Sequence, residues 1–182
     1  MIYVVRHGET DWNKERRMQG REGKPLNESG IKQAEEVRAE LASTVFQAVY
    51  SSPQQRAVET AEIVTGHRVT IDERLDVFDL GRADELPIQD VQYRGALPDP
   101  AIYEGMEDPD IFVKRVFAFM NWLEGVYGES DEDILLSGHR CTTGAIGAYF
   151  EGIPADRNIQ KYSSDHGRYK VYDFKKNRLP AD

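Results

Sequence analysis

The apolar positions of the chain follow two different spacings in turn. Short runs of apolar and β-branched residues, typical of buried strands, occur at Ile2 to Val5, Ala48 to Tyr50, Val69 to Ile71 and Ile134 to Leu136. Between these runs, apolar residues recur every three or four positions, which indicates amphipathic helices. The alternation predicts an α/β fold, a three-layer sandwich with a mostly parallel central sheet and helices on both faces.

Polar residues, prolines and glycines mark the ends of the predicted helices. Helix starts are predicted at Asn27, at Ser52-Pro53 and at Asp108-Pro109, and helix ends at Gly66 and near Gly128. The apolar faces of the first and third helices are formed by Ile31, Ala34, Val37 and Leu41, and by Phe112, Val116, Phe119 and Leu123.

The remaining stretches complete the predicted domain. Residues 72–108 carry many prolines, glycines and acids with weak periodicity, which predicts a long excursion that shapes substrate specificity. A last strand of β-branched and aromatic residues is expected at Tyr169 to Phe174. Since the chain has no repeat or Gly/Ser linker and its length suits one core, residues 1–182 are expected to form a single domain.

The composition narrows the class of protein. With 40% hydrophobic and 30% charged residues, the chain has the balance of a globular protein, and no apolar run reaches the roughly 20 residues of a membrane span. The first residues lack the basic and long apolar regions of a signal peptide, so we expect a cytoplasmic protein with no membrane partner. The 23 basic and 32 acidic residues give a net charge of −9, which argues against nucleic acid as a partner. An anionic substrate therefore needs a locally basic pocket.

Basic residues follow three of the predicted strands. Arg6 and His7 come directly after the first strand, where Gly8 lets the backbone turn sharply. Arg56 lies in the first turn of the helix after the second strand, where the helix N-terminus also favours anions. His139 follows a later buried strand. Because parallel strands end at one edge of an open α/β sheet, two histidines and two arginines are expected to meet there, a set suited to a phosphoryl group.

Other chemistries find less support in the sequence. A cysteine phosphatase carries arginine six positions after its cysteine, but Gly147 stands there relative to Cys141, which we expect to be a small buried residue. His67 and His166 lie in polar turns and are expected to be solvated. No carboxylate cluster has the spacing of metal ligands, so neither a metal nor another cofactor is expected.

Four motifs, in order along the chain, resemble the histidine phosphatase superfamily in its phosphoglycerate-mutase-like branch. They are RHGETDWN at residues 6–13, QGR at 19–21 with PLNESGIKQAEE at 25–36, SSPQQRAVETAE at 51–62 and LLSGH at 135–139. The ordered set covers most of the chain. The resemblance implies the three-layer fold predicted above and phosphoryl transfer through a histidine.

The resemblance also implies roles for single residues. His7 would be the nucleophile that becomes phosphohistidine, while Arg6, Arg56 and His139 would bind the phosphoryl oxygens. Positions that match the family's substrate pocket are Asn13, Gln19 and Gly20. The expected reaction is metal-independent hydrolysis of a small phosphorylated metabolite, with His7 neutral at its attacking nitrogen and His139 protonated.

Two positions depart from the family's pattern. Members of the branch that this chain resembles carry a glutamate after the third strand, and this glutamate is the general acid. This chain has Val77 at that position. Asp79 lies two residues on, on the same face of an extended segment, and is the candidate acid, whereas Asp76 would point away. After His139 the chain has Arg140 in place of the more common glycine, and this arginine either adds a cation to the pocket or faces solvent.

Three alternatives to a phosphomonoesterase stay open. The first is a phosphohistidine or phosphoprotein phosphatase of the same superfamily, which this chain resembles in lacking the glutamate. A phosphoglycerate-type mutase must keep its phosphohistidine from water, and mutases of the family are generally longer. A non-catalytic phospholigand-binding module is the third alternative, because of Val77. No motif identifies the natural substrate or the oligomeric state.

Overall fold

The central sheet of the protein contains five strands. In the computed structural model, which describes residues 1–177, these strands lie in the order β3, β2, β6, β1 and β7. Their bounds are Thr70–Ile71 (β3), Phe46–Ser51 (β2), Asp133–Gly138 (β6), Ile2–Arg6 (β1) and Tyr169–Tyr172 (β7). Strands β1, β2, β3 and β6 are parallel, and β7 pairs with β1 in the antiparallel direction. The predicted mostly parallel sheet is confirmed.

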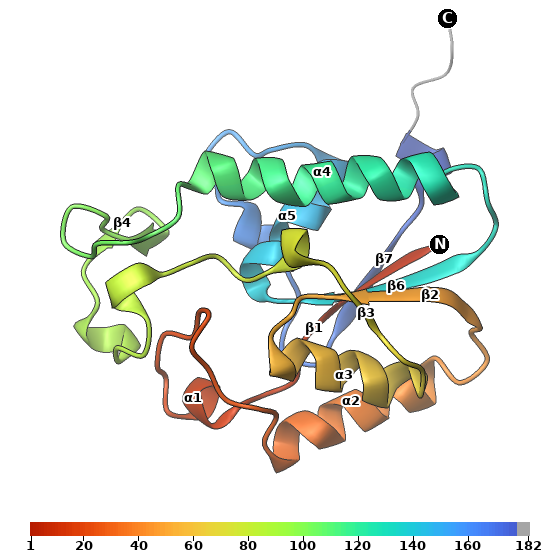
Figure 1. Ribbon diagram of the computed structural model, residues 1–182, viewed down its shortest axis with the longest axis horizontal. Coiled ribbons are helices and arrows are strands. Elements are labelled where there is room, and N and C mark those ends of the chain that lie inside the picture. Colours follow the sequence, from red (N-terminus) through yellow and green to blue (C-terminus); the bar gives the residue numbers. More distant parts are fainter. Residues whose placement is uncertain (178–182) are drawn as a thin grey trace, which may run out of the picture.

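Helices cover both faces of this sheet, as predicted. Helices α2 (Glu28–Glu40) and α3 (Gln55–Thr65) lie on one face, and α4 (Pro109–Tyr127) and α5 (Arg140–Glu151) lie on the other (Figure 1). The short helix α1 (Asp11–Lys14) precedes α2. Single 3-10 turns occur at Glu73–Leu75, Gly81–Ala83, Ile88–Asp90, Ile159–Tyr162 and Phe174–Asn177. Residues 1–177 contain no helix with both the length and the hydrophobicity of a bilayer span.

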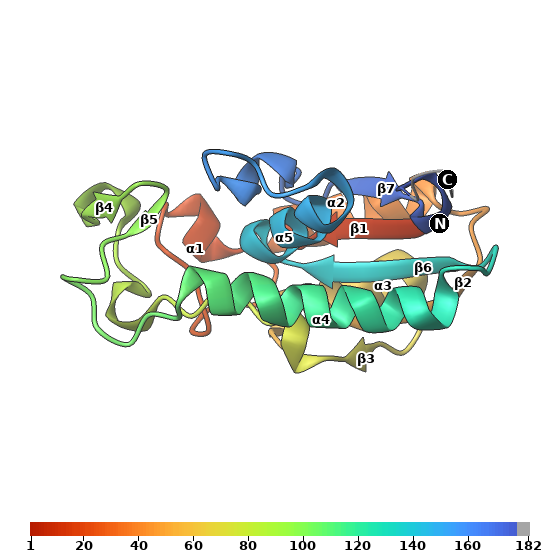
Figure 2. The ribbon, with the colours of Figure 1, turned by 90° about the horizontal axis from the view of Figure 1, so that it is seen from above.

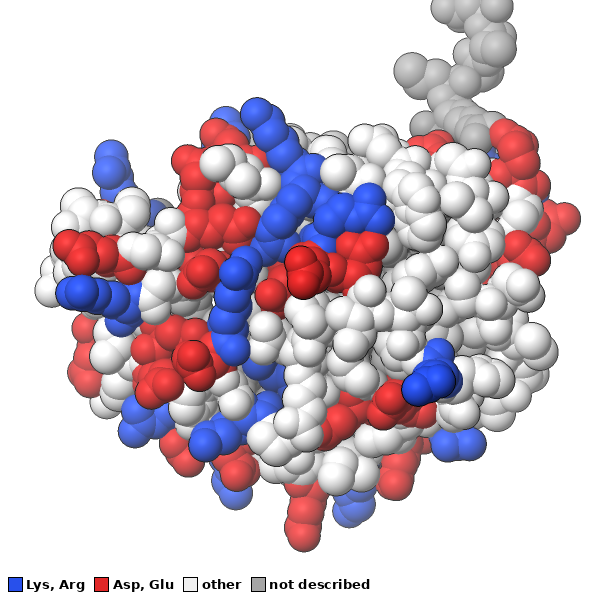
Figure 3. All heavy atoms as spheres, viewed as in Figure 1, with Lys and Arg blue, Asp and Glu red and all other residues white. Residues whose placement is uncertain are grey.

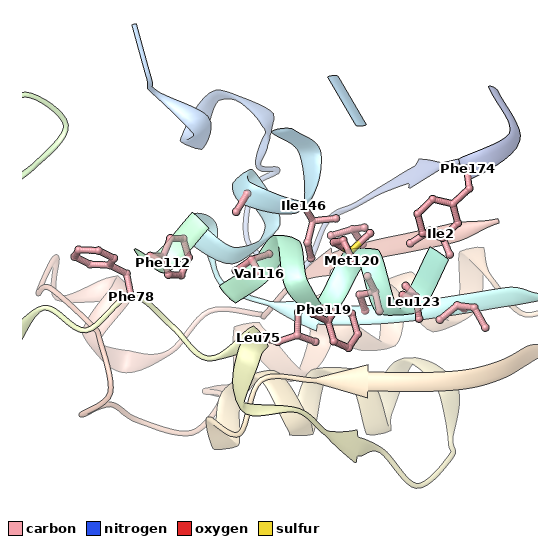
Figure 4. Close-up of a cluster of buried hydrophobic side chains, with 14 of the residues drawn as sticks. Ile2, Leu75, Phe78, Phe112, Val116, Phe119, Met120, Leu123, Ile146 and Phe174 are labelled. Carbon is pink, nitrogen blue, oxygen red and sulfur yellow. The ribbon is translucent and has the colours of Figure 1, made fainter. Parts of the chain in front are cut away.

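Successive side chains of the central strands serve two separate cores. Ile134 and Leu136 of β6 pack in the core beneath α4, whereas Leu135 between them packs in the core beneath α2 and α3. Figure 4 shows the larger core, with Phe119 and Leu123 of α4 directed at the sheet. The strand is therefore buried on both faces, which is why its apolar run is continuous rather than alternating.

Most helix ends lie where the sequence predicts them. Asn27 caps α2, Asp108 caps α4 with proline at the next position, and Gly66 ends α3 with a left-handed backbone. The predicted cap at Ser52 is wrong, because α3 begins later, after Gln54, whose side chain makes no capping bond. The Ser52 hydroxyl accepts from the Gln54 amide at 3.3 Å, ahead of the helix, and also bonds a histidine of the site described below.

Two further expectations need correction. Ile31, predicted on the buried face of α2, is exposed, so that face is formed by smaller side chains such as Ala34 and Val37. The last strand ends at Tyr172 rather than Phe174, which instead begins a 3-10 turn and packs in the larger core.

The predicted excursion at 72–108 consists of three 3-10 turns and a small hairpin, β4 (Tyr93–Arg94) and β5 (Leu97–Pro98). Figure 2 shows the hairpin at the end of the molecule toward which β1 and β6 point, next to the start of α4. The excursion therefore overhangs the carboxyl edge of the sheet, where ligands of open α/β sheets bind.

Arg115 of α4 holds the start of this excursion in place. Its guanidinium donates to the backbone oxygens of Arg74, Asp76 and Val77 at 2.9–3.1 Å. It also forms a two-pronged ion pair with Glu107. The hydrogen bonds of the Arg115 guanidinium thus hold the backbone at Val77 against α4.

Candidate active site

His7 lies where β1 ends, and its imidazole is buried, with 4% of the residue exposed. The ring Nδ1 donates to the backbone oxygen of Gly8 at 2.7 Å, which leaves the lone pair on Nε2. Burial, and then the nearby charge of Arg56, hold the pKa of His7 well below its ordinary value. The imidazole is therefore neutral near pH 7, and Nε2 is its nucleophilic atom.

Close backbone contacts fix the loop that follows His7. A Cβ atom on Gly8 would lie 2.5 Å from the backbone oxygen of Gly30, at the start of α2. The Gly8 amide donates to the hydroxyl of Thr60 in α3 at 3.1 Å. Only glycine permits this approach, so the two helices beneath the sheet position the nucleophile.

His139 is the second histidine at this edge of the sheet. It is buried, and its ring centroid lies 5.2 Å from that of His7. Its Nε2 bonds the Ser52 hydroxyl at 2.8 Å. Burial, followed by the charge of Arg56, lowers the pKa of His139 well below its ordinary value, so the ring is neutral near pH 7 when no anion lies beside it. A phosphoryl dianion beside the ring would favour the charged form.

Two arginines reach the same site from different elements. Arg6 donates to the backbone oxygen of Ser164 at 3.1 Å, and Arg56, only 2% exposed, donates to the backbone oxygen of Gly20 at 2.7 Å. Burial lowers the pKa of each guanidinium to about 10, which still leaves both charged at neutral pH. The bonds to backbone oxygens hold the cations without neutralising them.

Unpartnered polar atoms gather at these residues. In residues 1–177, five buried side-chain nitrogen or oxygen atoms have no hydrogen-bond partner, and four of them are nitrogens of predicted site residues: Arg6 Nε, Gln19 Nε2, Arg56 Nε and His139 Nδ1. A buried donor without an acceptor costs roughly 1–3 kcal/mol. An anion with several acceptor oxygens would satisfy donors of this kind, as a phosphoryl group does.

A cavity of about 260 Å³ opens beside the two histidines. Arg6, Arg17 and Arg140 contribute to its wall, which within residues 1–177 includes no aspartate or glutamate. Figure 3 shows a band of Lys and Arg side chains crossing the face seen in Figure 1, with acidic side chains on both sides of it. The charged side chains behind the net charge of −9 are thus unevenly distributed. The three arginines of the cavity wall form the locally basic pocket that an anionic substrate needs.

Comparison with known proteins agrees with this geometry. The family model described as the histidine phosphatase superfamily, branch 1, matches residues 2–180. The chain belongs to this superfamily. A protein named probable phosphoglycerate mutase GpmB, from Salmonella arizonae, is 32% identical over 166 residues, which cover 85% of this chain and 76% of that protein.

Solved structures of histidine phosphatase type share the fold. Bacillus stearothermophilus YhfR is 30% identical and superposes with a TM-score of 0.75, over 91% of this chain and 85% of that one. A phosphoserine phosphatase variant from Entamoeba histolytica, solved with phosphoserine, is 19% identical with a TM-score of 0.77, over 92% and 87% of the two chains. One of these similar proteins is named as a mutase and another as a phosphatase. Membership of the superfamily therefore leaves the reaction of this chain open.

The predicted substrate-binding residues lie at the cavity, with one exception. Asn13, Gln19 and Arg140 line it, so Arg140 contributes a cation to the pocket. The oxygen of Asn13 accepts from the Thr10 amide at 3.0 Å, which leaves its NH₂ group for a ligand. Gly20 lies behind the wall, where its backbone oxygen holds Arg56.

Val77, which stands where the sequence resemblance places a general acid, lines the cavity with 4% exposure. The structure does not bring Asp79 to the cavity wall. One oxygen of its carboxylate accepts from the Gly81 amide at 2.9 Å, and the other lies 3.7 Å from a nitrogen of Arg21. Asp76 is also off the wall and accepts from the Val77 amide at 2.7 Å. Among residues 1–177, the cavity wall thus contains basic and apolar residues but no carboxylate.

The prediction that His166 is solvated is wrong. Its Nε2 accepts from Arg6 at 2.9 Å, and its ring centroid lies 5.6 Å from that of His7. Burial, and then the charge of Arg6, lower the pKa of His166 to about 4, so it remains a neutral acceptor at pH 7. Because β7 is antiparallel, its beginning, not its end, lies at the edge where β1 ends.

Two smaller expectations can also be compared with the structure. His67 is exposed, as predicted. Cys141 is only partly buried and lines the cavity, where its Sγ accepts from the Phe78 amide at 3.4 Å. Burial raises the pKa of the Cys141 thiol, which is therefore protonated and uncharged at neutral pH.

Removing the His166 acceptor should weaken phosphoryl binding through Arg6. We expect His166→Leu to raise KM for a phosphate ester by roughly fivefold to tenfold with little change in kcat, the loss of about one hydrogen bond. His166→Gln offers an acceptor of similar reach and should restore most of the affinity, and His67→Leu should have no effect. Equal kinetics in the leucine and glutamine variants would contradict this positioning role.

The buried neutral histidines should also make the fold acid-sensitive. The pKa values of His7 and His139 are depressed, so the unfolded chain takes up protons below about pH 6.5 that the folded chain does not. The free energy of unfolding should thus be constant above that pH and fall as pH decreases, with a slope of up to about 1.4 kcal/mol per pH unit from each residue. Urea unfolding from pH 8 to 5 measures this slope, which His139→Asn should reduce. An unchanged slope in the variant would refute the assignment.

Proposed function

We propose that this protein is a metal-independent phosphatase that hydrolyses phosphomonoesters through a phosphohistidine on His7. The observation that carries the proposal is the set of four buried, unpartnered nitrogens on residues of one site, beside a neutral imidazole whose Nε2 has a free lone pair. A phosphoryl group fits both parts of this arrangement, since it offers acceptor oxygens and an electrophilic phosphorus.

The reaction would proceed in two displacements at phosphorus. His7 Nε2 attacks, the bond from phosphorus to the ester oxygen breaks, and the leaving group departs as an oxyanion that takes its proton from water. Arg6 and Arg56 stabilise the charge on the phosphoryl oxygens, and His139 donates to one of them from Nδ1. Water then attacks the phosphohistidine, the nitrogen–phosphorus bond breaks, and inorganic phosphate is released with the imidazole restored.

This chemistry needs no metal, because two guanidinium groups meet the phosphoryl charge. Within residues 1–177, no three or more His, Cys, Asp or Glu side chains are grouped so as to hold a metal ion. We therefore expect hydrolysis of 4-nitrophenyl phosphate to be unchanged by an excess of chelator. Activity that the chelator abolishes and magnesium restores would contradict the proposal.

Hydrolysis is favoured over mutase activity by the exposure of the cavity rim. Tyr93, which is 45% exposed, and the exposed residues Ala96 and Arg140 all contribute to the wall, so water can reach the phosphohistidine. The experiment is to incubate the protein with 4-nitrophenyl phosphate and, separately, with 3-phosphoglycerate. The proposal requires phosphate release from the first and no isomerisation of the second.

A phosphohistidine phosphatase is the second candidate, and the absence of a carboxylate from the cavity wall favours it. An imidazole leaving group can be protonated before it departs, so it places less demand on an acid of the enzyme. Comparing a phosphohistidine peptide with 4-nitrophenyl phosphate separates the two activities. Tight phosphate binding without turnover of either compound would instead indicate a binding module.

A further inference from the structure

A second and larger cavity, of about 810 Å³, adjoins the catalytic cavity. The two share five wall residues: Phe78, Ala96, Leu97, Cys141 and Gln160. Because these residues face both cavities, a molecule in the catalytic cavity lies next to the second cavity. Its volume is in the range of sites that bury a small organic molecule.

The walls of the second cavity are mainly apolar. Phe112, Val113 and Phe117 of α4 form one side, and Ile153 and Ile159, from the segment that follows α5, contribute to another. Figure 4 shows Phe78 and Phe112 at the same end of the core, and their rings meet edge to face with centroids 5.5 Å apart. Carbon surface of this kind favours an apolar ligand.

The rest of the wall contains polar and charged residues, among them Arg94, Lys114 and Asn158, whose side-chain oxygen is buried without a hydrogen-bond partner. Asp110 of α4 and Arg157, both more than half exposed, form an ion pair between α4 and the segment after α5. A sugar or nucleotide placed among the phenyl rings would lose hydrogen bonds to water without regaining them. The side of the wall formed by Phe112, Val113 and Phe117 therefore favours an apolar substituent over a strongly polar one.

We propose that the second cavity binds the apolar part of the substrate, which is the phosphate ester of a phenol with an apolar substituent. This inference rests on the proposed function, because it places the phosphoryl group at His7, the phenol ring in the catalytic cavity and the substituent between α4 and Ile159. A phenol fits better than an aliphatic alcohol because it can leave as the phenolate, and the catalytic cavity has no carboxylate to protonate the leaving oxygen.

The test compares 4-methylphenyl phosphate with 4-butylphenyl phosphate. Their phenols have nearly the same acidity, so the pair varies apolar length and leaves the chemical step unchanged. Each buried methylene is worth about fourfold in binding, so three added methylenes would give up to roughly 60-fold. We expect kcat/KM to rise at least about tenfold from the methyl to the butyl ester.

A matched pair of variants on α4 locates the effect. Val113→Trp places an indole ring against the apolar side of the cavity and should reduce the butyl-to-methyl ratio of kcat/KM toward one. Ile111→Trp, two residues away and 59% exposed outside the cavity wall, should keep the wild-type ratio. Ala118→Trp, on an exposed wall position of the same helix, repeats the test if Val113→Trp does not fold.

The outcomes distinguish this inference from the proposed function. Turnover that depends on His7 but has equal kcat/KM for the two esters, or a ratio that neither wall variant changes, would overturn the second-cavity proposal alone. Absence of turnover would overturn the proposed function. In that event, calorimetry with 4-butylbenzylphosphonate and 4-methylbenzylphosphonate still tests the cavity: tighter binding of the butyl compound, abolished by Val113→Trp, supports it, and equal binding refutes it.

Discussion

Replacing His7 with alanine should reduce kcat/KM for 4-nitrophenyl phosphate by roughly 10⁴–10⁶-fold, because it removes the nucleophile and with it the two-step path. The buried arginines remain in the variant, so phosphate should still bind. The measurement is steady-state hydrolysis beside calorimetric binding of inorganic phosphate. His67→Ala, at an exposed histidine far from the site in sequence, is the matched control and should keep wild-type activity.

Two results would contradict the role of His7. If His7→Ala kept full turnover, the nucleophile would be another group. If it lost both turnover and phosphate binding, with an unfolding midpoint well below that of the wild type, the loss would reflect the fold rather than the chemistry. The hydrogen bond from the His7 amide to Gly138 is a backbone bond and survives the substitution, so we expect the fold to persist.

The second large effect concerns the leaving group. Since Val77 stands where the sequence resemblance places a general acid, and the cavity wall formed by residues 1–177 has no carboxylate, turnover should fall steeply from nitrophenyl phosphate to alkyl phosphates. A well-placed acid is worth roughly 10²–10⁴-fold for poor leaving groups. Val77→Glu places a carboxyl group on the wall and should raise alkyl phosphate turnover toward that factor, while 4-nitrophenyl phosphate changes little.

Aspartate variants provide the controls for this prediction. Asp79 was the candidate acid on sequence grounds, but its carboxylate bonds the Gly81 amide outside the cavity wall, so Asp79→Asn should change neither class of ester more than about threefold. Selective loss of alkyl phosphate turnover in Asp79→Asn would show that Asp79 does act as the acid. A shallow dependence on leaving group, unchanged in this variant, would direct attention to Glu85 in the excursion.

The fold and the main site residues could be predicted because both follow from strand order. Continuous apolar runs between helical segments predict a parallel sheet, and the carboxyl ends of parallel strands meet at one edge. Arg6 is the last residue of β1, and His7 and His139 stand just past the ends of β1 and β6, which is why the sequence predicts them at one edge. Arg56 followed from its place in the first turn of α3.

The residues that sequence reasoning missed depend on contacts that the order of residues along the chain does not show. His166 precedes β7, which runs antiparallel to its neighbour in the central sheet, so the rule for parallel strands does not apply to it, and the available signal is a histidine three residues before a predicted strand. Ser52 is predicted as a helix cap because the sequence does not show that the helix begins only after Gln54 and that the Ser52 hydroxyl also bonds His139. The position of Asp79 depended on an extended backbone, whereas the chain turns there into the 3-10 segment Gly81–Ala83.

The central claim is that His7 carries the phosphoryl group during turnover, and rapid quenching tests it most directly. Protein mixed with an aryl phosphate labelled in its phosphoryl group, and quenched in alkali within the first turnover, should contain a labelled adduct that is stable to alkali and labile to acid. Peptide mapping should place it on His7, and His7→Ala should show none. An adduct on another residue, or hydrolysis at full rate with no adduct on any residue, would contradict the account.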